Sequence, residues 1–270
     1  MIAAITTIFF VLGLIIGSFL NVVIFRLNTE RSFGGRSGCL ACQNQLAWYE
    51  LIPVFSFLGL RGRCRNCKTK ISFQYPLVEL LTGLIFALLF LKFQDIFFFN
   101  TLVFSFTYAY YTTAFSLLLV IAIYDLKHKI IPDILSLILG ILAFVGLFFF
   151  RAAAGQIDSS SFAVFYPHLP STLEFLSGLL IAAPFALFWL VSSGRWMGLG
   201  DAKLAVGLGW LLGLSRILSG VVVAFWLGAI VGIVLVIFSK RKYGMKSEIP
   251  FAPYLVLGAL LAFLFELHLF

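Results

Sequence analysis

Residues 102–124 read LVFSFTYAYYTTAFSLLLVIAIY, an uncharged and mainly apolar run that ends directly before Asp125. A helical bilayer crossing needs about 20 such residues. A spanning segment must also satisfy its own backbone polar groups, which favours helices. Further stretches of the same kind lie at 2–25, 76–93, 130–150, 172–192, 202–214, 217–238 and 251–269. The sequence therefore predicts an all-α polytopic membrane protein with about eight transmembrane helices. The stretch 202–214 is short and rich in glycine, so full spanning stays open for it.

The composition agrees with this fold class. Hydrophobic residues make up 62% of the chain and charged residues 11%, whereas a soluble domain has about half and about a quarter. These values exclude a soluble enzyme, a disordered chain and a disulfide-stapled secreted scaffold. The first apolar stretch has no basic residue before it and runs into Asn21 and Arg26. It is therefore interpreted as a retained helix and not as a cleaved signal peptide.

The lysines and arginines predict the orientation of the chain. Of 19 such residues, all but Lys92, Arg151 and Arg216 fall on one side. The loops on that side are 26–75, 125–131, 192–203 and 239–249. The positive-inside rule makes these loops cytoplasmic and places both termini outside. The formal net charge of +8 thus has a membrane explanation, and no nucleic-acid partner is predicted.

Residues 26–75 form the one polar segment and contain all four cysteines. The cysteines form two CxxC pairs, Cys39 with Cys42 and Cys64 with Cys67. Two such pairs are typical of a closed, structural Zn²⁺ site. A redox dithiol pair and an iron–sulfur cluster are the alternatives, although no strand–helix context favours either. The predicted organisation is a first transmembrane helix over 1–25, a cytoplasmic zinc-binding domain over 26–75, and a transmembrane domain over 76–270.

Two aspartates are candidates for chemistry. Asp125 ends one apolar stretch, and Asp201 opens another within Gly198-Leu-Gly200-Asp201-Ala-Lys203. The predicted topology places both at the cytoplasmic boundary, where an ionisable group indicates a functional site. Two adjacent carboxyl groups share a proton, so one can activate water while the other polarises a carbonyl.

Two alternatives stay open at this point. Asp125 and Asp201 could instead pair with nearby lysines as interfacial anchors, and Asp133 competes with Asp125 as the partner of Asp201. Glu174 is discounted as part of a helix-capping box.

The chain resembles the prepilin peptidases, or type IV leader peptidases, over almost its whole length. The motifs that carry the resemblance are Gly17-Ser-Phe-Leu-Asn21-Val-Val-Ile-Phe-Arg26-Leu, the two CxxC pairs, Ile71 to Gly83 with Glu79, Asp125 to Asp133, Gly198 to Leu204, and Ile249-Pro250-Phe251-Ala252-Pro253-Tyr254. Asn28, Glu50-Leu51 and Ala252 depart from the usual family residues, where proline, an asparagine-rich pair and glycine are common. None of these departures touches the two aspartates or the four cysteines.

The resemblance implies a bacterial inner-membrane aspartyl protease of type IV pilus and type II secretion systems. Asp125 and Asp201 match its catalytic positions, with Gly198, Gly200, Lys203 and Asp133 in support. The implied substrates are prepilins and pseudopilins with a basic leader and a hydrophobic helix, cut after a glycine. Members with the cysteine domain then methylate the new amine with S-adenosylmethionine. Glu79, with Asn21 and Arg26, is the expected lining of that second site.

Two other function classes remain as alternatives. The aspartates could form the proton or cation site of a small transporter, although only one GxGD-like interruption occurs and transporters often repeat theirs. A non-catalytic assembly factor that docks secretion partners through its zinc domain is the third hypothesis.

Overall fold

The computed structural model describes residues 1–29, 34–150, 165, 167–195, 197–238 and 250–268. The predicted cytoplasmic loop 239–249 and Arg151 lie outside these ranges. The chain forms two compact units, Met1–Lys92 and Phe93–Phe270. In the described ranges the secondary structure is helical apart from isolated β-bridges.

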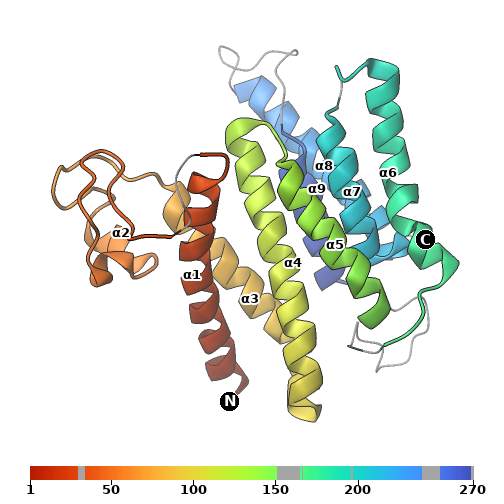
Figure 1. Ribbon diagram of the computed structural model, residues 1–270, viewed down its shortest axis with the longest axis horizontal. Coiled ribbons are helices and arrows are strands. Elements are labelled where there is room, and N and C mark those ends of the chain that lie inside the picture. Colours follow the sequence, from red (N-terminus) through yellow and green to blue (C-terminus); the bar gives the residue numbers. More distant parts are fainter. Residues whose placement is uncertain (30–33, 151–164, 166, 196, 239–249, 269–270) are drawn as a thin grey trace. The chain divides into compact units, whose positions relative to one another are not determined.

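The first unit contains α1 (Ile2–Arg26), the 3-10 helix η1 (Trp48–Leu51), the short α2 (Phe55–Gly59) and most of α3 (Gln74–Phe99) (Figure 1). We call residues 27–73, between α1 and α3, the cysteine segment.

Helices α1 and α3 pack at very short range through glycines. A Cβ added to Gly13 would lie 2.8 Å from the Cα of Gly83. One added to Gly17 would lie 2.7 Å from the Cα of Glu79. Small residues four positions apart are the usual means of close helix contact in membranes. This contact fixes the α1 face that carries Gly17 and Asn21 against the start of α3.

The second unit contains α4 (Thr101–His128), α5 (Asp133–Phe149), α6 (Thr172–Ser192), α7 (Leu199–Leu212), α8 (Leu214–Phe238) and α9 (Ala252–Leu264). Helix α7 packs against α5 and α6, while α9 packs against α4 and α8 (Figure 1). Glycines again permit close approach, since a Cβ on Gly209 of α7 would lie 2.6 Å from the Cα of Gly178 on α6.

An aromatic cluster packs α9 against α4. The ring of Phe263 lies 4.6 Å from that of Tyr111 and 5.3 Å from that of Phe115, measured between centroids. All three side chains are almost completely buried. Because α9 is held at this position on α4, its first turn has a defined place relative to the last turn of α4.

Every predicted apolar stretch forms a helix, but the expected number of spans is not established. Five described helices are long and apolar enough to cross a membrane: Ile2–Arg26, Gln74–Phe99, Thr101–His128, Thr172–Ser192 and Leu214–Leu235. Asp133–Phe149 and Ala252–Leu264 are apolar but shorter. Helix α7 has 14 residues, or about 21 Å at 1.5 Å per residue, against a hydrocarbon core of about 30 Å. The chain is thus a multi-pass membrane protein in which several helices are shorter than a full crossing.

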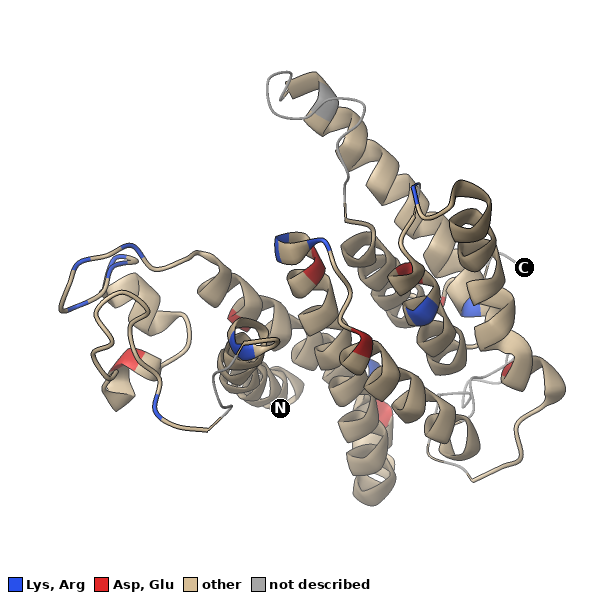
Figure 2. Cartoon of the chain, turned by 45° about the horizontal axis from the view of Figure 1, so that its top comes forward, with Lys and Arg blue, Asp and Glu red and all other residues tan. Residues whose placement is uncertain are grey.

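Charged residues are sparse along the helices and gather near helix ends and in the cysteine segment (Figure 2). The capping-box interpretation of Glu174 is confirmed: Ser171 Oγ accepts from the Glu174 N–H, and Glu174 Oε2 accepts from the Ser171 N–H at 2.7 Å.

Candidate functional site

The four cysteines lie in two turns with the same local geometry. The N–H of Gln43 donates to the carbonyl of Cys39 at 2.9 Å, and that of Lys68 donates to the carbonyl of Cys64 at 3.1 Å. Gln43 and Lys68 each follow the second cysteine of a pair, and both have left-handed φ, 57° and 58°. Two equivalent turns therefore direct two thiols each toward a common point.

The sulfur atoms are arranged as a metal site requires. All four Sγ atoms lie within 4.8 Å of one another, and those of Cys39 and Cys67 are 3.7 Å apart. A tetrahedral tetrathiolate with metal–sulfur bonds of about 2.3 Å has sulfur atoms about 3.8 Å apart. The cysteines are free thiols, and hydrogen bonds to Thr69 lower the pKa of the Cys67 thiol to about 6. The residues present thus fit a closed four-thiolate metal centre.

In the second unit, Asp125 and Asp201 are brought together from different helices. Asp125 lies in the last turn of α4, and Asp201 lies in the first turn of α7. Their side chains are buried, with exposed fractions of 5% and 8%. They are close enough to interact electrostatically. Their action as a catalytic pair stays a prediction.

The two carboxyl groups have different surroundings. The Asp125 carboxylate accepts a hydrogen bond from the N–H of Ala252, the first residue of α9. Oδ1 of Asp201 is buried and has no hydrogen-bond partner among the described residues. The pair is therefore asymmetric.

Asp133 has a different role from the pair. It is exposed, and its Oδ1 lies 2.7 Å from the Nζ of Lys203. This ion pair connects the start of α5 to the N-terminal half of α7. Lys203 thus pairs with Asp133, and the described residues show no ion pair between Lys203 and Asp201.

The two motif glycines serve different purposes. Gly198 is the N-cap of α7, and a Cβ added there would meet nothing closer than 3.9 Å. The backbone at Gly198 is therefore unobstructed before Asp201. At Gly200, in contrast, a Cβ would lie 2.9 Å from the Cβ of Ile131. Gly200 therefore permits close packing of α7 on the segment before α5.

In the first unit, Glu79 is a buried residue of α3 that holds the cysteine segment. Its Oε2 accepts a hydrogen bond from the N–H of Val54 at 2.8 Å, and its carboxylate is also bonded by the Ser18 hydroxyl. Val54 has φ 61° and ψ −50°, and the Phe55 N–H reaches the Pro53 carbonyl at 2.6 Å. This is a γ-turn with a left-handed central residue, a rare and strained conformation for a β-branched side chain.

Asn21 and Arg26 extend this network along α1. Nδ2 of Asn21 donates to the Tyr75 carbonyl at 3.0 Å, while its buried Oδ1 has no partner among the described residues. Arg26 donates to the Gly34 carbonyl at 2.7 Å. The structure thus places Asn21 and Glu79 at one helix interface, and Arg26 ties α1 to the cysteine segment.

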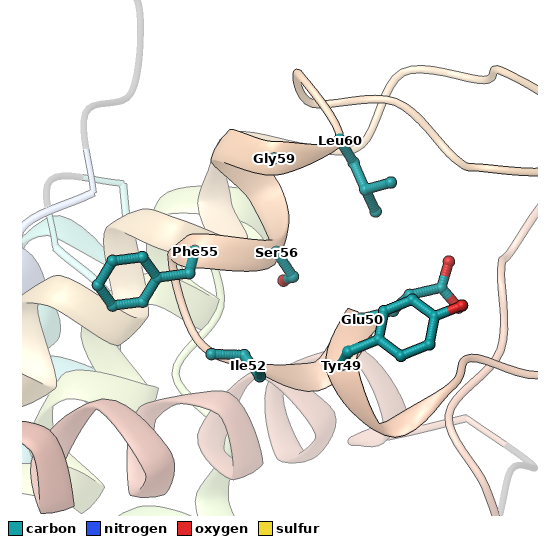
Figure 3. A pocket seen from close by; sticks show the side chains of 7 residues that line it. All are labelled: Tyr49, Glu50, Ile52, Phe55, Ser56, Gly59 and Leu60. Atoms are coloured by element: carbon teal, nitrogen blue, oxygen red, sulfur yellow. The ribbon is translucent and has the colours of Figure 1, made fainter.

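A mainly apolar, open pocket of about 290 Å³ lies in the cysteine segment. It is lined by residues of η1, α2 and their flanks: Tyr49, Glu50, Ile52, Phe55, Ser56, Gly59 and Leu60 (Figure 3). Leu60 points toward the side of the pocket formed by Tyr49 and Glu50 (Figure 3). The Glu50 carboxylate accepts a hydrogen bond from the Ala47 N–H at 2.8 Å, which fixes it at the pocket wall.

Two contacts of the site were not predicted from the sequence. The proline at 253 indicates that a helix begins near Ala252, but nothing local indicates that this amide reaches Asp125. The Val54 turn has no sequence signal, because a left-handed valine is contrary to its own preference.

A multi-pass membrane protein with two buried, adjacent aspartates and a separate four-cysteine centre has the arrangement expected of a membrane aspartyl protease with a metal-binding domain. Comparison with known proteins gives the same classification. The Bacterial Peptidase A24 N-terminal domain model matches residues 11–93, and the Type IV leader peptidase family model matches residues 112–237.

Similar proteins include three that carry the name prepilin leader peptidase/N-methyltransferase. The protein from Myxococcus xanthus is 36% identical over 242 residues, which cover 88% of this chain and 65% of that protein. The one from Bacillus subtilis is 31% identical over 96% of this chain and 94% of its own length. The one from Pseudomonas aeruginosa is 30% identical over 94% and 88%. No solved structure matches. The chain belongs to the type IV leader peptidase family, and the transporter alternative is not favoured.

Proposed function

We propose that this chain removes the leader peptide from type IV prepilins and pseudopilins and then methylates the new N-terminal amine. The observation that carries the first activity is the buried pair formed by Asp125 and Asp201. The relatives named prepilin leader peptidase/N-methyltransferase match over most of both units of the chain.

Cleavage by the pair follows from its shared proton. The ionised carboxylate takes a proton from water as the water oxygen bonds to the peptide carbonyl carbon. The protonated carboxyl group gives its proton to the carbonyl oxygen, so a neutral tetrahedral diol forms. The first carboxyl then protonates the amide nitrogen, the C–N bond breaks, and a diol proton returns to the second. The pair ends in its starting state, and water has been divided between the two products.

The proposed location of this chemistry is the cytoplasmic face of the bacterial inner membrane. The strong bias of lysine and arginine toward the loops on the aspartate side supports that orientation, with both termini outside. A substrate with a hydrophobic helix in the bilayer then presents its basic leader on the same side. Its scissile bond, after a glycine, lies at the depth of the two aspartates.

We propose a structural role for Zn²⁺ in the cysteine segment, held by Cys39, Cys42, Cys64 and Cys67. The 3.7 Å separation of two Sγ atoms supports this assignment. A segment of about fifty residues buries little apolar surface, so bound Zn²⁺ would contribute much of its folding free energy.

We place methyl transfer in the first unit, with Glu79, Asn21 and Arg26 as residues of that site. S-adenosylmethionine, when bound, supplies an electrophilic methyl group. The orphan Oδ1 of Asn21 offers a buried acceptor to a ligand, and the Glu79 carboxylate is a base for the proton that the amine must lose. The pocket beside Glu50 adds apolar walls for a nucleoside ring and one carboxylate for hydroxyl groups.

The test uses the purified chain in detergent with a prepilin and S-adenosylmethionine. Mass measurement of the product is expected to show loss of the leader and a gain of one methyl group. Glu79→Gln is expected to abolish the methyl gain while cleavage continues. Methylation at the wild-type rate by this variant would show that Glu79 holds the cysteine segment but takes no part in methyl transfer. Absence of cleavage by the wild-type chain would reject the proposed peptidase.

A further inference from the structure

We propose that the single proton of the pair resides on Asp201, and that the backbone N–H of Ala252 keeps Asp125 ionised as the general base. This inference rests on the proposed peptidase function and assigns different roles to the two aspartates. It also makes the first turn of α9 a third part of the catalytic site.

The Ala252 amide is available because of its position in α9. The first N–H groups of a helix have no partner within the helix. Ala252 is the first residue of α9 and is completely buried, so its N–H must find an acceptor elsewhere. It finds the Asp125 carboxylate. A hydrogen bond from a backbone amide stabilises the ionised form of a carboxyl group.

Asp201 has the opposite surroundings. The buried Oδ1 of Asp201 lacks a partner among the described residues. A buried carboxylate oxygen without a donor makes the ionised form costly. A protonated Asp201 avoids that cost and holds a proton ready for the substrate carbonyl oxygen.

Helix dipoles act in both directions here. Asp201 lies in the first turn of α7, which favours its ionised form, whereas Asp125 lies in the last turn of α4, which disfavours its ionised form. The N-terminus of α9, the positive end of its dipole, lies at Asp125 and favours the ionised form, so it opposes the effect of α4. The direct hydrogen bond from the amide is stronger than the field of a single helix end, and the N-terminus of α9 acts in the same direction as the amide.

Other charged groups near the pair do not reverse this assignment. The titratable groups at the nearby ends of the helices packed around Asp125 are Tyr124, Lys127, His128 and the C-cap Lys129 of α4, Asp133 on α5, Asp201 and Lys203 on α7, and Tyr254 on α9. Lys203 is neutralised by Asp133 at 2.7 Å. Asp201 interacts electrostatically with Asp125, and two adjacent acids hold one proton between them.

With these roles, Asp125 removes the proton from water and later protonates the leaving amine. Asp201 donates its proton to the carbonyl oxygen and recovers it from the diol. Each aspartate ends in the state in which it began, so no further proton donor is needed.

The test replaces one atom of the backbone. Lactic acid introduced at position 252 turns the amide into an ester, which removes the N–H and keeps the methyl side chain. The matched control is the same replacement at Ala262, a buried residue of α9 away from the pair. The control removes a donor within the helix, whereas the ester at 252 removes only the donor to Asp125; both esters also weaken the carbonyl of the preceding residue as an acceptor. Ala252→Pro removes the same N–H by ordinary mutagenesis at the first position of a helix, but it disfavours the αR backbone of the preceding Phe251, so the ester is the cleaner variant.

The measurement is the pH dependence of kcat/KM for prepilin cleavage. Loss of one hydrogen bond to a charged group is expected to move the acidic limb of the profile toward neutral pH by about one to two units. At a pH below the wild-type limb, kcat/KM then falls about tenfold to a hundredfold, and it recovers at higher pH. The ester at 262 is expected to leave the limb in place.

An unmoved acidic limb in both position-252 variants would overturn the assignment, as would a shift confined to the alkaline limb. These outcomes require that the wild-type chain cleaves, so they differ from failure of the proposed peptidase, in which no profile exists.

Discussion

Replacing Glu79 with alanine removes the acceptor that holds the Val54 N–H in a left-handed γ-turn. The bond measures 2.8 Å, Glu79 is buried in α3, and Val54 has φ 61°. Losing the acceptor of a partly buried donor costs about 1–3 kcal/mol. The strain of the turn, on the order of 1–3 kcal/mol, is then no longer opposed. The variant is expected to release residues 48–60 from α3.

Hydrogen exchange in detergent measures this release. Amides of residues 48–60 are expected to exchange about 5- to 150-fold faster in Glu79→Ala, as a loss of about 1–3 kcal/mol predicts. Glu79→Gln retains a carbonyl oxygen and is expected to change exchange less. Val54→Gly in the alanine background is expected to restore part of the protection, because glycine adopts a left-handed φ without a Cβ penalty. Unchanged exchange of residues 48–60 in Glu79→Ala would refute the reasoning.

Three further predictions concern the rest of the site. Gly200→Ala is expected to destabilise the protein by about 1–3 kcal/mol, because the new Cβ would lie 2.9 Å from the Cβ of Ile131 and overpack the contact. Thermal unfolding in detergent measures this loss. Ile131→Ala in the same chain is expected to recover part of it. A double-mutant cycle on Lys203 and Asp133 is expected to give a coupling of about 0.2–1 kcal/mol, as for other exposed ion pairs, and a coupling well above that range would contradict a surface role. Cys64→Ser and treatment with a strong chelator are each expected to release zinc and to impair methylation at least as severely as cleavage. Metal analysis and the product mass measure these two effects. Wild-type protein purified without metal would contradict the zinc assignment.

The parts of the fold that could be predicted from the sequence are those encoded by local patterns. Long apolar runs predicted the helices because the bilayer imposes their length and composition. The Ser171–Glu174 capping box was predicted because both partners lie within one turn. The number of complete crossings was not predictable in the same way, since α5 and α9 are shorter than their apolar runs suggested, while α7 is as short as its run.

In the functional site, too, local features could be predicted from the sequence and tertiary contacts could not. The CxxC spacing predicted the four-sulfur cluster, because each pair is a local turn. For Asp125 and Asp201, the predicted topology placed both at one boundary, and the structure brings them within electrostatic range of each other. The Ala252 amide and the Gly200–Ile131 packing depend on how α9 and α5 meet their neighbours. Contacts of that kind are set by tertiary packing, which no local pattern encodes.

The central claim is that Asp125 and Asp201 act together in hydrolysis. Its most direct test is the cleavage of a prepilin by purified Asp125→Asn and Asp201→Asn variants, with the product followed by mass. The account predicts that wild-type protein releases the leader while neither variant does, although both insert into the membrane and bind zinc as the wild type does. Full cleavage by either variant would contradict it.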